Sequence, residues 1–275
     1  MNYFVFRFVI NPVQPGTDIL TALLGELPFE SFVSNEKGLD AFIKEEDFND
    51  DLLNDLPELD FTYSFTIEKI QQQNWNAQWE SNFNPVLVED KCIIRASFHE
   101  APQYGIMDII IDPKMSFGTG HHDTTWLMSR ELFVLDLKNK SVLDMGCGTG
   151  VLAIIAKKLG ANTVSGIDID EWSIENSREN AQVNNCTEIL FEKGNASLLS
   201  NKKYDIILAN INRNVLLNDL ETYYNCLNKN GVLLLSGFFE NDFNELNQKA
   251  ISLHYTFEKK ESKNNWCLLN YSKTQ

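Results

Sequence analysis

The stretch VLDMGCGTG at residues 142–150 decides the fold class of this chain. A strand-like apolar run at 141–145 leads into the glycines, and a helix-like apolar run, VLAIIA at 151–156, follows them. The glycines therefore occupy a strand-to-helix turn, where the lack of a Cβ lets the backbone approach a ligand closely. A second apolar run at 163–167 ends at Asp168, 18 residues past Gly150, and a carboxylate at this spacing suits ribose hydroxyls. The pattern predicts a nucleotide-type cofactor site.

The spacing of the glycines favours S-adenosylmethionine over a dinucleotide. Gly146, Gly148 and Gly150 follow G-x-G-x-G, whereas the dinucleotide pattern G-x-G-x-x-G needs a glycine at Val151. S-adenosylmethionine has no pyrophosphate, and its sulfonium is positive, so a nearby carboxylate such as Asp144 is electrostatically favourable. With Asp144 before it, the motif resembles the first motif of the Rossmann-like methyltransferases. The alternative is a glycine-rich turn that binds no ligand.

Length and composition set the class of protein. With 275 residues, of which 43% are hydrophobic, the chain is long enough for two folded domains. The formal charge of −16 disfavours direct binding to nucleic acid and would attract a basic partner. Five cysteines at scattered spacings, without a C-x-x-C pair, predict reduced thiols and no metal site. Residues 1–10 resemble a strand rather than a signal peptide, and no run is long enough to cross a membrane, so we expect a cytoplasmic protein.

The first 70 residues predict a small α+β domain. Its expected elements are a strand at 3–10, a helix at 17–27, strands at 29–34 and 39–43, a helix at 46–53 and a strand at 61–70. This order is the split βαβ, or ferredoxin-like, arrangement. Nothing in it looks catalytic, so a substrate-recognition domain at 1–70 is one interpretation, and a purely structural role is the other. A linker helix is expected at 71–84, with Trp75 and Trp79 on one face.

The remainder, 85–275, predicts a single cofactor-binding domain. Short strands at 86–88, 92–94 and 108–111 lead into a regular alternation of strands and helices. Such alternation implies a doubly wound, mainly parallel α/β sheet of seven strands, as in the Rossmann-like methyltransferases. Helices are expected at 124–135, 151–159, 171–184, 214–227 and 241–250, and strands at 141–145, 163–168, 189–192, 205–209, 232–236, 255–259 and 266–271. The last two strands have no helix between them, so they should form a hairpin that makes one strand antiparallel.

Two further segments carry polar groups suited to a site. The loop DPKMSFGTGHHDTT at 112–125 precedes the sheet and is expected over the cofactor, since ligands of such sheets bind beyond the carboxyl ends of the strands. Thr124 or Thr125 is expected to cap the helix that follows. The segment DIILANIN at 205–212 is a buried strand ending at Asn210, whose carboxamide would offer a donor and an acceptor at the rim. A simple strand-end cap is the alternative for Asn210.

Together these motifs make the chain similar to the PrmA family, the ribosomal protein L11 methyltransferases. The similarity runs from about Trp75 to the C-terminus. It is carried by Asp112-Pro113, Phe117-Gly118-Thr119-Gly120, His122, Thr124-Thr125, Val142-Leu143-Asp144, Gly146-Cys147-Gly148, Gly166-Ile167-Asp168-Ile169-Asp170, Ser177-Arg178-Glu179-Asn180-Ala181 and Ala209-Asn210-Ile211. The resemblance implies S-adenosylmethionine contacts at Thr125, Gly146, Asp168 and Asn210. It departs from the family at His121, Asp123 and Asn212, where threonine, proline and leucine are common.

The resulting hypothesis is a methyltransferase that modifies lysine side chains and the N-terminal amine of ribosomal protein L11, a basic partner. Asp144 and Gly148 join the expected cofactor residues, and Asn210 is the candidate for orienting the amine. The sequence indicates no catalytic base, because alignment and desolvation of a neutral amine are enough for methyl transfer. Two alternatives remain open: methylation of another protein or a small molecule, and a non-catalytic binding module that keeps the fold.

Overall fold

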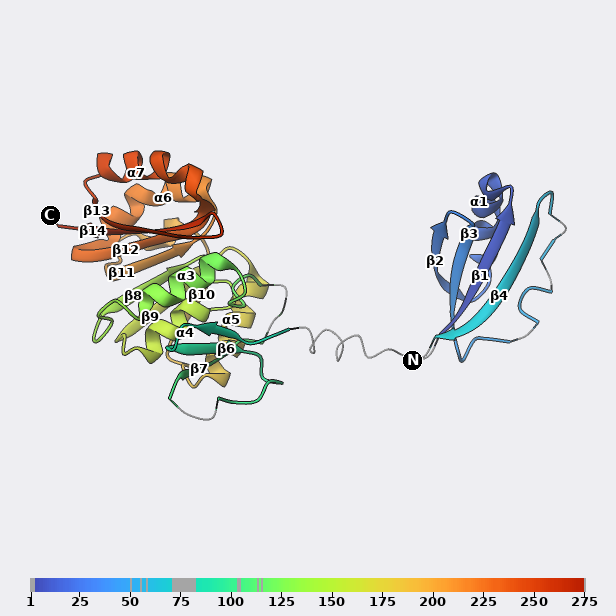
Figure 1. The fold of residues 1–275 in the computed structure, drawn as a ribbon, viewed down its shortest axis with the longest axis horizontal. Coiled ribbons are helices and arrows are strands. Elements are labelled where there is room, and N and C mark those ends of the chain that lie inside the picture. Colours follow the sequence, from blue (N-terminus) through green and yellow to red (C-terminus); the bar gives the residue numbers. More distant parts are fainter. Residues whose placement is uncertain are drawn as a thin grey trace. The chain divides into compact units, whose positions relative to one another are not determined.

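The computed structural model describes residues 3–49, 51–54, 56–57, 59–70, 83–102, 105–112, 114 and 116–274. The chain divides into two compact units, Met1–Asn82 and Phe83–Gln275, whose elements are labelled in Figure 1. Of the expected linker helix at 71–84, residues 71–82 lie outside the described residues, and with them Trp75 and Trp79. Phe83 and Asn84 are described and are not helical.

The described residues of the N-terminal unit form a four-stranded antiparallel sheet in the order β2-β3-β1-β4 with a helix packed on it. Its elements are β1 Tyr3–Asn11, α1 Val13–Leu24, β2 Phe29–Asn35, β3 Gly38–Lys44 and β4 Thr62–Ile70. Alternate residues of β1, among them Phe6 and Phe8, point to the helix and pack with Leu20 and Leu24. This strand order is that of the split βαβ arrangement expected from the sequence.

The predicted helix at 46–53 is wrong. Residues 45–47 and 51–54 form turns, and a side chain there takes a backbone amide that a helix would need. The Asn49 side chain accepts from the Asp51 amide at 2.9 Å, and Asn54 donates to the Asp51 carboxylate at 2.7 Å. The apolar residues of this stretch still cover the core, since Phe48 stacks on Phe4 with ring centroids 4.2 Å apart.

The larger unit contains a seven-stranded sheet in the order β10-β9-β8-β11-β12-β14-β13. The strands are β8 Ser141–Met145, β9 Thr163–Asp168, β10 Leu190–Lys193, β11 Tyr204–Asn210, β12 Leu227–Phe239, β13 Thr256–Lys263 and β14 Trp266–Lys273. The first five are parallel, and β14 runs antiparallel to both β12 and β13. The expected closing hairpin of β13 and β14 is confirmed. A smaller sheet precedes the main one in sequence and consists of β5 Val86–Val88, β6 Cys92–Arg95 and β7 Met107–Ile110.

Helices cover both faces of the main sheet (Figure 1), as the alternation of its strands requires. The helices are α3 Asp123–Leu132, α4 Val151–Lys158, α5 Glu171–Val183, α6 Arg213–Cys226 and α7 Phe243–Ser252, with 3-10 turns at Ala196–Leu199 and Glu240–Asp242. One face of the sheet, which includes Val142, Ile206 and Leu208, packs in an apolar cluster with α3, α4 and α5. The other face, which includes Leu143 and Ile207, packs in a second cluster with α6 and α7. The fold class expected from the sequence is therefore confirmed.

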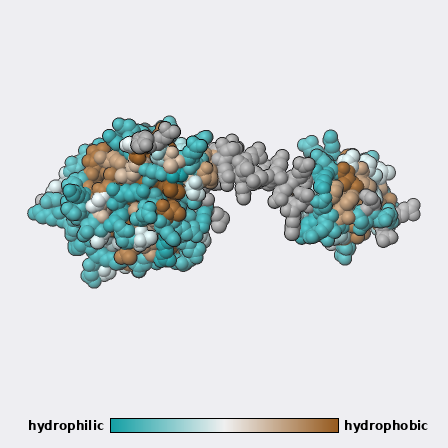
Figure 2. Space-filling model, turned by 90° about the horizontal axis from the view of Figure 1, so that it is seen from below, coloured by the Kyte–Doolittle hydropathy of each residue, from teal (hydrophilic) through white to brown (hydrophobic). Residues whose placement is uncertain are grey.

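Three further observations concern the surface, the helix lengths and the cysteines. Hydrophilic residues cover much of the face seen in Figure 2, interrupted by apolar patches. No helix within the described residues is long and apolar enough to cross a bilayer. All five cysteines are buried and unpaired.

Candidate active site

A cavity of about 550 Å³ opens at the carboxyl ends of the parallel strands. Met145 at the end of β8, Asp168 at the end of β9 and Asn210 at the end of β11 all line it. Parallel strands bring their carboxyl ends to one edge, which is why residues distant in sequence meet here. The volume lies within the range of about 300–1,000 Å³ that small-molecule sites occupy.

The glycine loop forms the floor of this cavity. Gly146, Gly148 and Gly150 have φ values of 71°, 51° and 79°, a region that residues with a Cβ rarely adopt. Close contacts add to this requirement: a Cβ on Gly148 would lie 2.2 Å from the carbonyl oxygen of Phe117. Gly146 and Gly148 both line the cavity, so the loop presents bare backbone to it.

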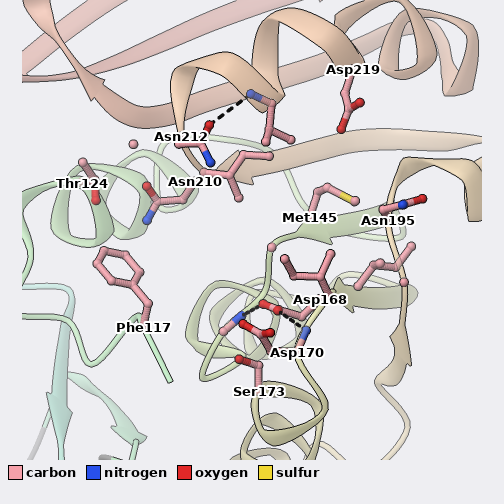
Figure 3. Close-up of a pocket in the computed structure, with 18 of the residues that line it drawn as sticks. Phe117, Thr124, Met145, Asp168, Asp170, Ser173, Asn195, Asn210, Asn212 and Asp219 are labelled. Atoms are coloured by element: carbon pink, nitrogen blue, oxygen red, sulfur yellow. Dashed lines mark hydrogen bonds between the residues drawn. The ribbon is translucent and has the colours of Figure 1, made fainter. Parts of the chain in front are cut away.

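Asp168 lies at the rim beside the glycine loop (Figure 3). One carboxylate oxygen accepts from the Gly148 amide at 2.9 Å and the other accepts from the Asp170 amide at 3.0 Å. Each oxygen of a carboxylate has two acceptor positions. The backbone therefore fixes the orientation of Asp168 and leaves acceptor capacity for ligand hydroxyls.

Asp144 occupies a different place from the other candidate residues. Its side chain is 1% exposed and does not line the cavity. One carboxylate oxygen accepts from the Ala153 amide in the first turn of α4 at 3.1 Å. Burial raises the pKa of Asp144 to about 7, and the nearby charge of Asp168 acts in the same direction. Asp144 thus links β8 to α4 beneath the glycine loop, and its action on a ligand would be through its charge rather than by contact.

The loop that precedes α3 lies against the glycine loop, as the sequence predicts. The Thr149 amide donates to the Phe117 carbonyl at 2.9 Å, and the Thr149 hydroxyl donates to the Gly118 carbonyl at 2.6 Å. Phe117 and His122 consequently line the cavity. The expectation that a threonine caps α3 is wrong, because His122 is the N-cap and its Nδ1 accepts from the Thr124 amide at 3.3 Å.

Asn210 and Thr125 form a pair at the opposite side of the cavity from Asp168. The Asn210 Nδ2 donates to the Thr125 hydroxyl at 3.4 Å, while the Asn210 Oδ1 is buried without a hydrogen-bond partner. Thr125 is fully buried and does not line the cavity, whereas Thr124 does. Figure 3 shows Thr124, Asn210 and Phe117 together, away from Asp168 and Asp170. A buried acceptor without a partner, on a residue that lines the cavity, is a place where a ligand donor could bind.

The charges around the cavity suit a cationic ligand. Asp168, Asp170 and Asp219 line it, and none of its described lining residues is lysine or arginine. Burial raises the pKa of Asp219, whose carboxylate accepts from the Tyr223 hydroxyl at 3.3 Å. A dinucleotide pyrophosphate would meet only repulsion from these carboxylates, whereas S-adenosylmethionine offers ribose hydroxyls and a positive sulfonium. The residues present therefore fit S-adenosylmethionine.

The three departures from the family pattern have local explanations. His121 hydrogen-bonds the Asn84 carbonyl through Nε2 at 2.8 Å. Asp123 forms an ion pair with Lys263 at 2.9 Å in the first turn of α3. Asn212 caps α6 by accepting from the Val215 amide at 3.1 Å. None of these contacts disturbs the glycine loop.

Several lining residues escaped the sequence reasoning. Trp266 begins β14 and reaches the cavity from about a hundred residues after Asp168, and no local signal marks it. Asn195 and Asp219 line the cavity as well. Asn195 follows a strand of the parallel sheet, so the rule that predicted Asn210 could have found it. The roles of Thr125, Gly146, Asp168 and Asn210 toward a cofactor stay predictions.

Comparison with known proteins decides the family. The family model of the ribosomal protein L11 methyltransferases (PrmA) matches residues 20–274. The chain belongs to the PrmA family. A relative named ribosomal protein L11 methyltransferase from Bacteroides fragilis is 41% identical over 98% of this chain and 99% of its own length. Another relative of the same name, from Porphyromonas gingivalis, is 42% identical over 99% of this chain and 98% of its own length. The family predicted from the motifs is confirmed.

One solved structure agrees with this placement within the PrmA family, and a second shares the fold. A crystal structure of a ribosomal protein L11 methylase from Lactobacillus delbrueckii subsp. bulgaricus superposes with a TM-score of 0.66 and 27% identity. It covers 70% of this chain and 100% of the solved chain. A methyltransferase from Pyrococcus furiosus shares the fold, with a TM-score of 0.52 and 20% identity. The match covers 61% of this chain and 90% of the solved chain.

Proposed function

We propose that this PrmA-family enzyme transfers methyl groups from S-adenosylmethionine to amino groups of ribosomal protein L11 in the cytoplasm. Lysine side chains and the N-terminal amine are the expected acceptors. The observation that carries the proposal is the pairing of two features in one cavity: an oriented carboxylate, Asp168, and an unpaired amide oxygen on Asn210.

The donor half of the site is assigned to the glycine loop and Asp168. The Asp168 carboxylate is assigned to accept from ribose hydroxyls, and the backbone at Gly146 and Gly148, which lines the cavity, to contact the adjoining part of the ligand. Thr125 is assigned to hold Asn210 in place through the 3.4 Å hydrogen bond. When bound, S-adenosylmethionine supplies an electrophilic methyl group on a positive sulfur.

The acceptor half is assigned to Asn210 and the neighbouring apolar groups. A lysine amine has a pKa near 10.4 in water, and only the neutral form has a free lone pair. Desolvation beside the positive sulfonium of the bound donor disfavours a second positive charge and lowers that pKa. An N–H of the amine can donate to the Asn210 Oδ1, which orients the lone pair. The main contribution of the chain is then alignment and desolvation, without a dedicated base.

A protein rather than a free metabolite fits the mouth of the cavity. Four of its lining residues are large apolar side chains that remain exposed: Phe117, Ile169, Trp172 and Val215. Such a rim is typical of a surface that a larger partner covers. The charge of −16 would speed encounter with a basic ribosomal protein and disfavours direct binding of nucleic acid. The N-terminal unit is the candidate for recognising this partner.

Intact-mass analysis of unmethylated ribosomal protein L11 tests the proposal. After incubation with this enzyme and S-adenosylmethionine, the mass should rise by multiples of about one methyl group. If the mass does not change although calorimetry detects S-adenosylmethionine binding, the target is another protein or a small molecule. No mass gain and no binding would support a non-catalytic module.

A further inference from the structure

A row of buried asparagines along α5 has no part in the assignments above. Asn176, Asn180 and Asn184 follow one another at intervals of four, so they face the same side of the helix, which Asn184 caps at its C-terminus. Each of the three is at most 4% exposed. Asparagine is a poor helix former, and its amide is costly to bury unless it is hydrogen-bonded. The partners of these side chains therefore show what the row holds in place.

The Asn184 side chain holds the end of β7. Its Oδ1 accepts from the Ile110 amide at 3.0 Å, and its Nδ2 donates to the Ile110 carbonyl at 2.6 Å and to the Asn180 carbonyl at 2.8 Å. Among the described residues, none of its side-chain hydrogen bonds reaches the glycine loop. Asn184 thus joins α5 to the small sheet alone.

Asn180 joins two segments that border the cavity. Its Oδ1 accepts from the Asp112 amide at 3.1 Å, and its Nδ2 donates to the Thr149 carbonyl at 2.9 Å. Asp112 starts the loop that leads to Phe117, whereas Thr149 belongs to the glycine loop. A single side chain, itself 1% exposed, therefore ties the loop before α3 to the glycine loop.

Thr149 extends this connection to the cavity. While its carbonyl accepts from Asn180, its amide donates to the Phe117 carbonyl at 2.9 Å and its hydroxyl to the Gly118 carbonyl at 2.6 Å. The loop before α3 is thus fastened at its start by Asn180 and at Phe117 and Gly118 by Thr149. Phe117 lines the cavity, but Asn180 and Thr149 do not.

The same connection bears on the carboxylate of the site. Gly148 directly precedes Thr149, and its amide donates to Asp168 at 2.9 Å. A shift of the Thr149 peptide would carry that amide away from the carboxylate. Asn180 consequently acts on both walls of the cavity from outside it: on Phe117 on one side and on the orientation of Asp168 on the other.

We propose that Asn180 is a positioning residue for S-adenosylmethionine, which raises the affinity of the cavity for the donor without touching it. Loops that are already held in their bound positions lose less conformational freedom when a ligand binds, so the ligand binds more tightly. The inference rests on the proposed function, because it takes the donor as the occupant of the cavity. It goes beyond that function by naming a residue outside the cavity that sets the affinity.

The test compares Asn180→Ala with Asn184→Ala in the full-length protein. Each variant removes a buried amide of the same row that bonds the backbone of 110–112, but only Asn180→Ala also releases the Thr149 carbonyl. Both should unfold at lower urea concentration than the wild type. In calorimetry, affinity for S-adenosylmethionine should fall at least about fivefold in Asn180→Ala and less than about twofold in Asn184→Ala. Equal losses in the two variants, or no loss in Asn180→Ala, would overturn the inference.

A second substitution leaves the shape of the side chain unchanged. Asn180→Asp keeps an acceptor for the Asp112 amide and removes only the donor to the Thr149 carbonyl. It therefore serves if Asn180→Ala does not fold, and it should lose affinity for the donor to a similar extent. Binding of S-adenosylmethionine as tight as in the wild type would show that the Thr149 contact does not position the site.

Kinetics distinguish positioning of the donor from a general loss of structure. In Asn180→Ala the KM for S-adenosylmethionine should rise at least about fivefold, whereas kcat and the KM for ribosomal protein L11 should stay within about twofold of the wild type. A lower kcat with an unchanged KM for the donor would contradict the assignment.

Methylation of ribosomal protein L11 by the same preparations separates this inference from the proposed function. If the wild type methylates L11 and Asn180→Ala binds the donor normally, the positioning role is wrong and the proposed function stands. If the wild type binds the donor, Asn180→Ala alone loses affinity, and L11 is not methylated, the target is wrong and the positioning role stands.

Discussion

Replacing Gly148 with alanine tests the structural role of the glycine loop most directly. Gly148 has a φ of 51°, and a Cβ there would lie 2.2 Å from the Phe117 carbonyl oxygen. That oxygen is backbone and cannot turn aside as a side chain could. It also accepts from the Thr149 amide at 2.9 Å, so relieving the contact means separating the two loops.

The magnitude follows from the contacts that must change. A left-handed backbone costs a residue with a Cβ about 1–2 kcal/mol. Weakening the Thr149–Phe117 hydrogen bond adds about 0.5–1.5 kcal/mol, and weakening the Gly148–Asp168 bond, which involves a charged group, adds about 1.5–3 kcal/mol. The free energy of unfolding should fall by about 3–6.5 kcal/mol in total. Because Asp168 loses its orientation, affinity for S-adenosylmethionine should fall at least about tenfold.

Gly160→Ala provides the matched control. Gly160 also has a positive φ, 98°, but the nearest atom to its Cβ would be the Lys138 Cα at an ordinary 3.8 Å. It should show only the backbone cost of about 1–2 kcal/mol and unchanged cofactor affinity. Urea unfolding and calorimetry with S-adenosylmethionine measure both quantities. If Gly148→Ala unfolds no more readily than Gly160→Ala and binds the cofactor normally, the argument from the loop contact is wrong.

Three further predictions concern carboxylates. Asp168→Ala should weaken S-adenosylmethionine binding about 10- to 150-fold by calorimetry, and unchanged affinity would contradict its ribose role. Burial raises the pKa of Asp144 from 3.8 to about 7, so the native state retains a proton that the unfolded chain releases. Stability should therefore fall as the pH rises from about 4 to about 7, by about 4 kcal/mol in total, and Asp144→Asn should flatten this slope in urea unfolding. Asp123→Ala and Lys263→Ala should each raise the KM for ribosomal protein L11 up to about fivefold, and the double variant should raise it no further. If the two effects add instead, the ion pair between Asp123 and Lys263 does not position Trp266.

Much of the site could be predicted because its chemistry lies at the ends of regular elements. The glycines must be in a strand-to-helix turn, and Asp168 and Asn210 follow apolar runs that only a buried parallel strand explains. Parallel topology then brings these ends to one edge. By contrast, the segment 46–53 has a helix-like pattern of apolar residues, but the Asn49 side chain accepts from the Asp51 amide there and turns form instead.

The sequence by itself determined the α/β alternation, the glycine loop and the carboxylate and amide at the ends of the strands, because each depends on residues close together along the chain. Only the tertiary structure decided which groups face the cavity. It placed the Asp144 carboxylate beneath the loop, turned Thr125 toward Asn210, and brought Trp266 from the last strand to His122. The Thr125–Asn210 and His122–Trp266 contacts join segments that lie tens to more than a hundred residues apart, and they depend on how β11 and β14 pack with α3. Local patterns do not encode that packing.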